Sequence, residues 1–188
     1  MAFVDSLSVM LLAAGASTLL LAIYALMAAR NKKGIANLAV PMFVFGLFNF
    51  VSGFYMSFAW PLPAAYNILF GDAQLFLGLL MLMGGYMLYK NMDLKVLTIF
   101  GFFFGIYLAM QAAAIPAFGL ETGSHFLPSF GLYVFAALSA LFSPLVYVKG
   151  KNSMKYAYYF LFALLIITTL LLLFLGYSSV YEHLGSPP

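Results

Sequence analysis

The sequence predicts an all-α, polytopic membrane protein in which six transmembrane helices form three helical hairpins, with both termini outside. Two observations predict this class. Of the 188 residues, 65% are hydrophobic and 7% are charged, whereas soluble domains contain about 25% charged residues. The few charges also lie between long uncharged stretches, so lipid rather than water must cover most of the surface. The chain contains no cysteine, which excludes disulfides and thiolate metal sites.

Six uncharged stretches are long enough to span a bilayer. About 20 apolar residues in a helix cross a hydrocarbon core about 30 Å thick. The first stretch is expected to be a retained span rather than a cleaved signal peptide, because Asp5 precedes it and Arg30 follows it. Pro116 is expected to end the fourth helix and Pro128 to begin the fifth. The whole chain is then one six-helix domain, with spans at about residues 6–29, 38–60, 68–89, 96–115, 130–148 and 156–177.

The charges are sorted by side of the membrane. The eight Lys and Arg residues all lie in three short segments, 30–33, 90–95 and 149–155, which follow the first, third and fifth spans. Short loops rich in Lys and Arg stay in the cytoplasm, so the sequence predicts a multi-pass protein of the cell membrane with extracytoplasmic termini. The loops recur at a spacing of about 60 residues, which is consistent with a threefold internal repeat of hairpins. Any six-span protein with short loops would show the same spacing, so both interpretations stay open.

Ionisable residues are absent from the middle of the predicted spans. This absence excludes a retinal Schiff base, haem ligation within the bundle and the buried carboxylates of proton-coupled pumps. Neutral polar side chains remain, and we expect four of them to line a pore: Asn49, Gln74, Tyr86 and Gln111. A narrow pore with hydrogen-bonding walls selects small uncharged solutes, so the sequence favours a channel or facilitator for urea, a short amide or ammonia. The alternative is that these amides join helices across their interfaces.

Small residues recur at helical spacing and predict close helix packing. Gly101 and Gly105 form a Gly-x-x-x-Gly motif, and stripes of glycine and alanine follow other spans. The same surfaces could join a larger assembly, so a second hypothesis is a non-catalytic accessory subunit of a membrane complex, or a homo-oligomer. The glycines expected at packed interfaces are Gly46, Gly53, Gly78, Gly85, Gly101 and Gly105.

Acidic and histidine side chains gather on the outer side. Glu121 and His125 are four residues apart, and Glu182 is next to His183. Imidazole and carboxylate groups could bind a divalent metal, or could sense outside pH and gate a pore; solvated loop residues are the third interpretation. The gating or metal candidates are Asp72, Glu121, His125, Glu182 and His183. The sequence has no catalytic or nucleotide-binding motif, so we expect no enzyme activity, no cofactor and no nucleic-acid partner.

Several local stretches resemble known six-span families. They are Ala36-Asn37-Leu38-Ala39-Val40 before the second span, Gly78-Leu79-Leu80 through Tyr86-x-x-Tyr89 in the third, Asn91 and Asp93 in the turn that follows, and Phe102-Phe103-Phe104 in the fourth. With six spans, outer termini and outer histidines, the chain resembles the urea and short-chain amide channels, and this resemblance implies a pore for a small amide. It resembles at least as well a family of uncharacterised six-span membrane proteins of archaea, which implies the fold and no particular activity.

Overall fold

Six long helices dominate the computed structural model, which describes residues 6–185; Asp5 lies outside the described residues. Within that range there is no β-strand. Six helical segments are long and apolar enough to cross a membrane, so the predicted all-α six-span class is confirmed. The long helices are α1 (Ser6–Ala29), α2 (Ala39–Ala59), α3 (Ala73–Tyr89), α4 (Leu97–Phe118), α5 (Phe126–Leu141) and α6 (Lys151–Gly185). Short 3₁₀ helices lie at Ile35–Leu38, Leu94–Val96, Gly123–His125 and Ser143–Tyr147, and a π-helix at Asn67–Asp72 leads into α3.

Two helix ends differ from the predicted spans because of proline and glycine. Pro116 was predicted to end the fourth helix. Instead it lies inside α4, which continues to Phe118. Its ring removes one backbone donor near the end of the helix, and Gly119 ends the helix instead, with φ of 59°. α5 begins just before Pro128, as predicted, and ends at Leu141 rather than near 148. Pro144 accounts for the early end, because it cannot continue the hydrogen-bond ladder, and the chain goes on as a 3₁₀ helix.

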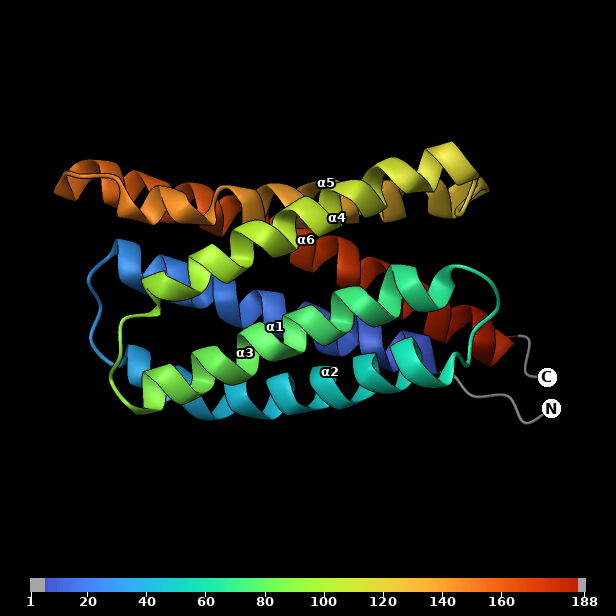
Figure 1. Ribbon diagram of the computed structural model, residues 1–188, viewed down its shortest axis with the longest axis horizontal. Helices are drawn as coiled ribbons and strands as arrows, with labels where there is room; N and C mark the ends of the chain where they lie inside the picture. Colours follow the sequence, from blue (N-terminus) through green and yellow to red (C-terminus); the bar gives the residue numbers. More distant parts are fainter. Residues whose placement is uncertain (1–5, 186–188) are drawn as a thin grey trace.

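The helices form two layers that α6 joins. In Figure 1, α1, α2 and α3 lie below, α4 and α5 lie above, and α6 begins beside α5 and crosses to α1. Consecutive helices run antiparallel, as hairpins do. The most extensive packing, however, is between α2 and α3, between α4 and α5, and between α1 and α6. The predicted hairpins join α1 with α2, α3 with α4, and α5 with α6 through the basic turns. In the structure each helix packs most extensively against a different neighbour.

Glycines set the close approach of α2 and α3. A Cβ added to Gly46 would lie 2.6 Å from the backbone nitrogen of Leu82, and one added to Gly85 would lie 2.8 Å from the backbone nitrogen of Phe43. Gly53 and Gly78 likewise face backbone atoms of the partner helix. In the second layer, a Cβ on Gly105 would lie 2.6 Å from Leu141 N, and one on Gly101 would lie 3.0 Å from Ser143 Oγ. All six glycines that the sequence singled out therefore lie where two helices touch.

The two ends of the bundle differ in charge. We call the end with the loops 30–38, 90–96 and 148–150 the basic end, and the end with the loops 60–66 and 119–125 the acidic end. At the basic end, α1 and α3 terminate alike: Asn31 and Asn91 have φ of 48° and 54°. The amide that follows each of them donates to the carbonyl five residues earlier, from Lys32 to Met27 at 2.9 Å and from Met92 to Met87 at 2.8 Å. The spacing of about 60 residues thus recurs in the backbone of two of the three basic turns.

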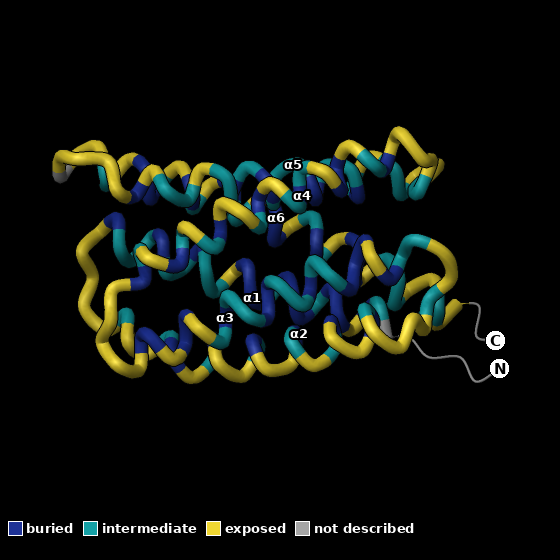
Figure 2. The backbone as a smooth tube through the Cα atoms, in the orientation of Figure 1, coloured by how far each residue is buried: buried dark blue, intermediate teal, exposed yellow. Residues whose placement is uncertain are grey.

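The outer faces of the helices carry apolar side chains. Figure 2 shows exposed residues around the outside of the bundle and buried ones along its inside. On α2 the buried residues follow one stripe at three- and four-residue steps, and the rest of the helix exposes valine, leucine and phenylalanine. Apolar side chains on the outer surface are what a helix in contact with lipid requires.

Candidate functional site

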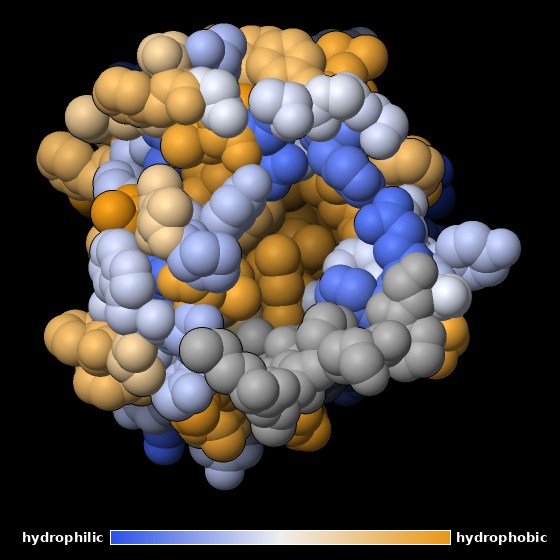
Figure 3. All heavy atoms as spheres, turned by 90° about the vertical axis from the view of Figure 1, so that its right-hand side faces the viewer, coloured by the Kyte–Doolittle hydropathy of each residue, from blue (hydrophilic) through white to orange (hydrophobic). Residues whose placement is uncertain are grey.

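A central cavity of about 210 Å³ lies inside the bundle. All six long helices contribute to its wall. Along α1 the lining runs from Leu7 to Ala25, about 27 Å at 1.5 Å per residue. That length covers most of a hydrocarbon core about 30 Å thick. Figure 3 shows a hollow at the acidic end, with a hydrophilic rim and hydrophobic walls.

The wall of the cavity is mostly hydrocarbon, and its serine and threonine hydroxyls are already used as donors. Ser139 donates to the carbonyl of Phe135 at 2.8 Å, and Thr168 to that of Leu164 at 2.9 Å. Thr18, Thr98 and Ser143 also donate to backbone carbonyls. Because their protons are engaged, these hydroxyls offer an occupant of the cavity acceptor lone pairs.

A second apolar cluster lies beside the cavity toward the basic end, where Lys95 also lines the cavity. The cluster consists of Ala25, Ala29, Val146, Tyr158 and Leu161, all buried. The rings of Tyr24 and Tyr158 meet edge to face, with centroids 6.4 Å apart. Tyr158 lines both the central cavity and a second pocket at the basic end. It is therefore part of a wall between the two spaces.

The second pocket, which we call the basic pocket, holds about 450 Å³ between the end of α1 and the start of α6. Its cationic side chains are Arg30, Lys32 and Lys155. The remaining lining is Ala28, Ala29, Asn31, Asn152, Met154, Tyr158 and Tyr159.

Of the four predicted pore residues, Gln74 lines the central cavity. Its Nε2 donates to Asn49 Oδ1 at 2.7 Å and to the carbonyl of Met10 at 3.2 Å. Both amide hydrogens of Gln74 are thereby used, so the atom that it can offer an occupant is the acceptor Oε1.

Asn49, the second predicted pore residue, is not part of the cavity wall. It is fully buried between α1, α2 and α3, where its Nδ2 donates to Ser17 Oγ at 2.6 Å and its Oδ1 accepts from Gln74. The reason is its position between Gly46 and Gly53 on the α2 stripe that packs against α3. Asn49 therefore joins three helices.

Gln111 and Tyr86 also lie outside the cavity wall. Gln111 Nε2 donates to the carbonyls of Ile68 and Leu69 in the π-helix, at 2.9 and 3.1 Å, while its buried Oε1 has no hydrogen-bond partner. Tyr86 is 54% exposed. It follows the packed Gly85 by one residue, which turns it about 100° around α3 and away from the interface. Asn49, Tyr86 and Gln111 therefore do not line this cavity, and their role in a pore stays a prediction.

The π-helix before α3 is a polar crossing point that the sequence did not reveal. Tyr133 donates to the carbonyl of Leu69 at 2.5 Å, beside the bond from Gln111. Asp72, at the end of the π-helix, accepts from Ser57 at 2.6 Å and from Tyr107 at 2.7 Å. π-Helical turns occur often at functional sites. Here this turn presents acceptors to α2, α4 and α5, and Asp72 is held between helices rather than free in a loop.

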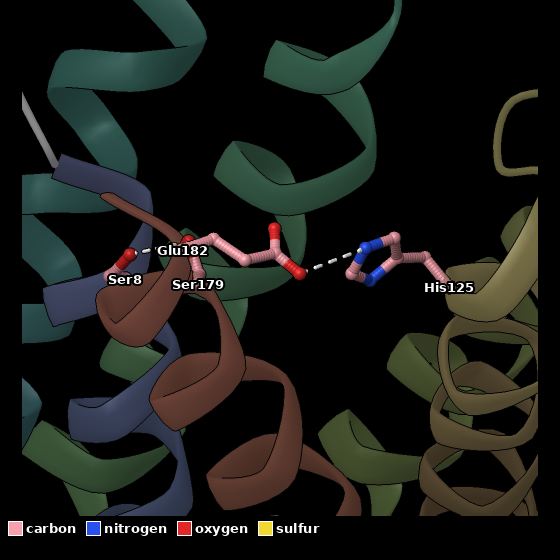
Figure 4. Close-up of polar contacts among 4 residues, drawn as sticks. All are labelled: Ser8, His125, Ser179 and Glu182. Atoms are coloured by element: carbon pink, nitrogen blue, oxygen red, sulfur yellow. Dashed lines mark hydrogen bonds and ion pairs between the residues drawn. The ribbon is translucent and has the colours of Figure 1, made fainter. Parts of the chain in front are cut away.

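The other acidic-end candidates come together only in part. His125 Nε2 lies 3.4 Å from Glu182 Oε1, which joins the start of α5 to the end of α6, and Ser8 and Ser179 join α1 to α6 nearby (Figure 4). Burial raises the pKa of Glu121 above its ordinary value, and His125 opposes this rise. Burial also raises the pKa of Tyr66, and Glu121 adds to the effect.

A metal centre at this end has no support in the geometry. Across residues 6–185, no three His, Asp or Glu side chains lie close enough together to hold a metal ion. Asp72 is bonded to hydroxyls of α2 and α4, and His183 is half-buried on α6. The predicted metal ligands are therefore not assembled into one site.

Fold and cavity together define the class: a multi-pass α-helical membrane protein whose bundle encloses an apolar space. Within that class, the chain belongs to the family described as "Protein of unknown function (DUF981)", which matches residues 1–186. No curated protein and no solved structure matches the chain. Family membership agrees with the resemblance to uncharacterised six-span proteins, whereas no link to the urea and short-chain amide channels emerges.

Proposed function

We propose that the protein is a facilitator for a small, neutral solute that carries N–H groups, and that the solute crosses through the central cavity. The observation that carries this proposal is the cavity itself, which follows α1 for about 27 Å and touches all six helices. A cavity of that length lies along the route that a permeating molecule needs.

The chemistry of the wall favours solutes that donate hydrogen bonds and are weakly hydrated. The lining hydroxyls and Gln74 offer acceptors, as described above. The long apolar stretches of the wall have no polar groups to replace the hydration shell of a solute, so an ion would meet a high barrier to entry. Ammonia fits this wall best, and short amides and urea follow in the order of their greater cost of dehydration.

The basic pocket would complete the route and exclude cations. Tyr24 and Tyr158 would form the closure between the cavity and the basic pocket. Beyond them, Arg30, Lys32 and Lys155 would repel ammonium, while neutral ammonia would pass. By the positive-inside rule we place this end in the cytoplasm, and the acidic end with both termini outside the cell membrane.

Outside pH would modulate such a route weakly. His125 and Glu182 are 41% and 59% exposed, and exposed ion pairs contribute about 0–1 kcal/mol. A contribution of that size can shift an equilibrium between open and closed states by at most about fivefold. Gating through this pair alone would therefore be a modest effect.

The decisive experiment fills the cavity. Ala136 on α5 lines it, whereas Ala113 on α4 is exposed on the outer surface. Ala136→Phe adds a ring to the cavity, and Ala113→Phe adds the same ring on the lipid side. Proteoliposomes of the wild type and both variants would be compared with empty liposomes by stopped-flow, with ammonia, acetamide and urea as separate probes.

We expect the wild type and Ala113→Phe to pass at least one probe faster than empty liposomes, and Ala136→Phe to fall to the empty-liposome rate. Wild-type vesicles as tight as empty ones at every pH would refute the facilitator proposal. Stable co-purification with other membrane subunits, together with such tightness, would favour the accessory-subunit hypothesis instead.

A further inference from the structure

The basic pocket concentrates positive charge without a matching carboxylate. Arg30, Lys32 and Lys155 all line it. In the described part of the chain the recorded ion pair, His125 with Glu182, is at the opposite end. The acidic residue nearest in sequence to a basic turn is Asp93, and its carboxylate accepts the backbone N–H of Lys95 at 3.0 Å. Asp93 is close enough to act electrostatically on Tyr24 and Tyr158, so the three cations of the pocket outnumber the one carboxylate near them.

The pocket also lies where two apolar helices meet basic loops. The candidate span in α1 ends at Ala29 and the one in α6 begins at Asn152, and such an end of a membrane helix is where lipid headgroups are expected. The pocket lies at the N-terminal end of α6, so the helix dipole adds to its positive potential. Lys155 lies 5.8 Å from the ring centroid of Tyr159, which holds this cation beside the apolar wall.

The lining combines cations with hydrocarbon. Next to the three charges stand Met154, Tyr158 and Tyr159. A free inorganic phosphate would use the charges and leave the apolar wall unused, whereas a phospholipid would use both. Basic pockets between membrane helices bind the phosphates of anionic lipids in this manner.

We propose that the basic pocket is a binding site for the phosphate headgroup of an acidic phospholipid, with Arg30, Lys32 and Lys155 as its ligands. A phospholipid so placed ties the end of α1 to the start of α6, the two helices that come from opposite ends of the chain and pack together along their length. A phospholipid bound here would share the basic pocket with the end of the proposed solute route and would offset part of its charge. The lipid site is therefore tested by lipid binding and not by solute flux.

The test compares two charge-matched double variants of the full chain. Arg30→Gln with Lys155→Gln removes two charges from the pocket. Lys33→Gln with Lys149→Gln removes two from exposed positions at the same end that are not part of its lining. Binding of phosphatidylglycerol and of phosphatidylcholine would be measured by native mass spectrometry of the detergent-solubilised protein, after thermal unfolding shows that both variants are folded.

We expect the wild type to prefer phosphatidylglycerol, and the pocket variant to bind it about 25-fold more weakly, or about fivefold for each charge. The control variant should stay within about twofold of the wild type. Equal losses in both variants, or no preference for the anionic lipid, would overturn the site.

Competition with soluble phosphates distinguishes a site for a lipid headgroup from a site for a free phosphate. Inorganic phosphate and glycerol 3-phosphate, added at the lipid concentration, should displace little phosphatidylglycerol. Full displacement by either would identify a soluble anion site and overturn the lipid assignment. The Ala136→Phe variant should bind phosphatidylglycerol as the wild type does, so a failure of the solute route and a failure of this site can be told apart.

Discussion

The contact between α2 and α3 makes a specific stability prediction for Gly78→Ala. A Cβ at Gly78 would meet backbone atoms of Phe50 and would lie 2.8 Å from the backbone carbon of Asn49. Backbone atoms cannot rotate away as a side chain can, so the two helices must separate. Gly131 on α5 is the matched control, because a Cβ there would find Leu171 Cδ1 at 3.6 Å, an ordinary contact.

The magnitude follows from two opposing effects. Replacing glycine by alanine inside a helix stabilises it by about 0.5–1 kcal/mol, and both sites share this gain. Overpacking a well-packed interface destabilises by about 1–3 kcal/mol, and this applies to Gly78 alone. The difference between the two variants therefore isolates the close approach. We expect Gly131→Ala to be slightly more stable than the wild type, and Gly78→Ala to be about 1–3 kcal/mol less stable than Gly131→Ala.

The assay can use the single tryptophan of the chain. Trp60 caps the end of α2 and is 49% exposed, so its fluorescence reports on this helix. Unfolding by sodium dodecyl sulfate in mixed micelles, followed by fluorescence and by circular dichroism, gives the free energy for each variant. If Gly78→Ala proves as stable as Gly131→Ala, the reasoning that the two backbones touch is incorrect.

Three further predictions concern polar groups. Asn49→Ala should destabilise the protein by about 1–3 kcal/mol because the amide that donates to it loses its acceptor, whereas Ser52→Ala, which removes an exposed bond within α2, should change little; an equal effect in the same unfolding assay would contradict this. Tyr107→Phe should destabilise by about 1–3 kcal/mol because the carboxylate of Asp72 loses one of its two hydroxyl donors, and an unchanged unfolding midpoint would count against that bond. Glu121→Gln should stabilise the protein at pH 7, and this gain should vanish below about pH 4.5. Burial raises the pKa of the Glu121 carboxyl, so the protonated carboxyl favours folding. That contribution is lost as the pH rises through the folded-state pKa, and glutamine, which stays neutral, avoids the loss. A gain that grows on acidification would reverse the sign assigned to Glu121.

The sequence predicted the six spans well because hydropathy is a property of the chain read in one dimension. Charged residues cannot lie in the hydrocarbon core without a partner, so the gaps between them define the helices. The end of the fourth span was predicted wrongly, because proline and glycine both occur there and either can end a helix. Pro116 was expected to end it, but Gly119, three residues later, adopts the left-handed conformation that ends α4. The interface glycines were also visible in advance, because their spacing on α2 and α3 places them on one face.

Pairing of the helices could not be read in the same way. Helices α1 and α6 come from opposite ends of the chain, and their packing depends on shape rather than on connection. One trace was present: Gly15 and Gly176 each face a leucine of the other helix, at 2.9 Å from the added Cβ. A stripe of small residues shows that a helix packs closely, but it does not name the partner.

The polar residues of the spans show why the sequence alone could not predict which of them line the cavity. In lipid, an amide that is not hydrogen-bonded is costly, so the first requirement on a neutral polar side chain is a partner, and the nearest partners are on adjacent helices. Asn49 and Gln111 meet that requirement by joining helices outside the cavity wall, whereas Gln74 joins helices and also lines the cavity. In the proposed route, the groups available to a solute are Gln74 and the hydroxyls whose donors are satisfied within their own helix, such as those of Ser139 and Thr168. Serine and threonine bonded to their own backbone are therefore better candidates than amides for the lining of an apolar route, and the cavity of this protein is built in that way.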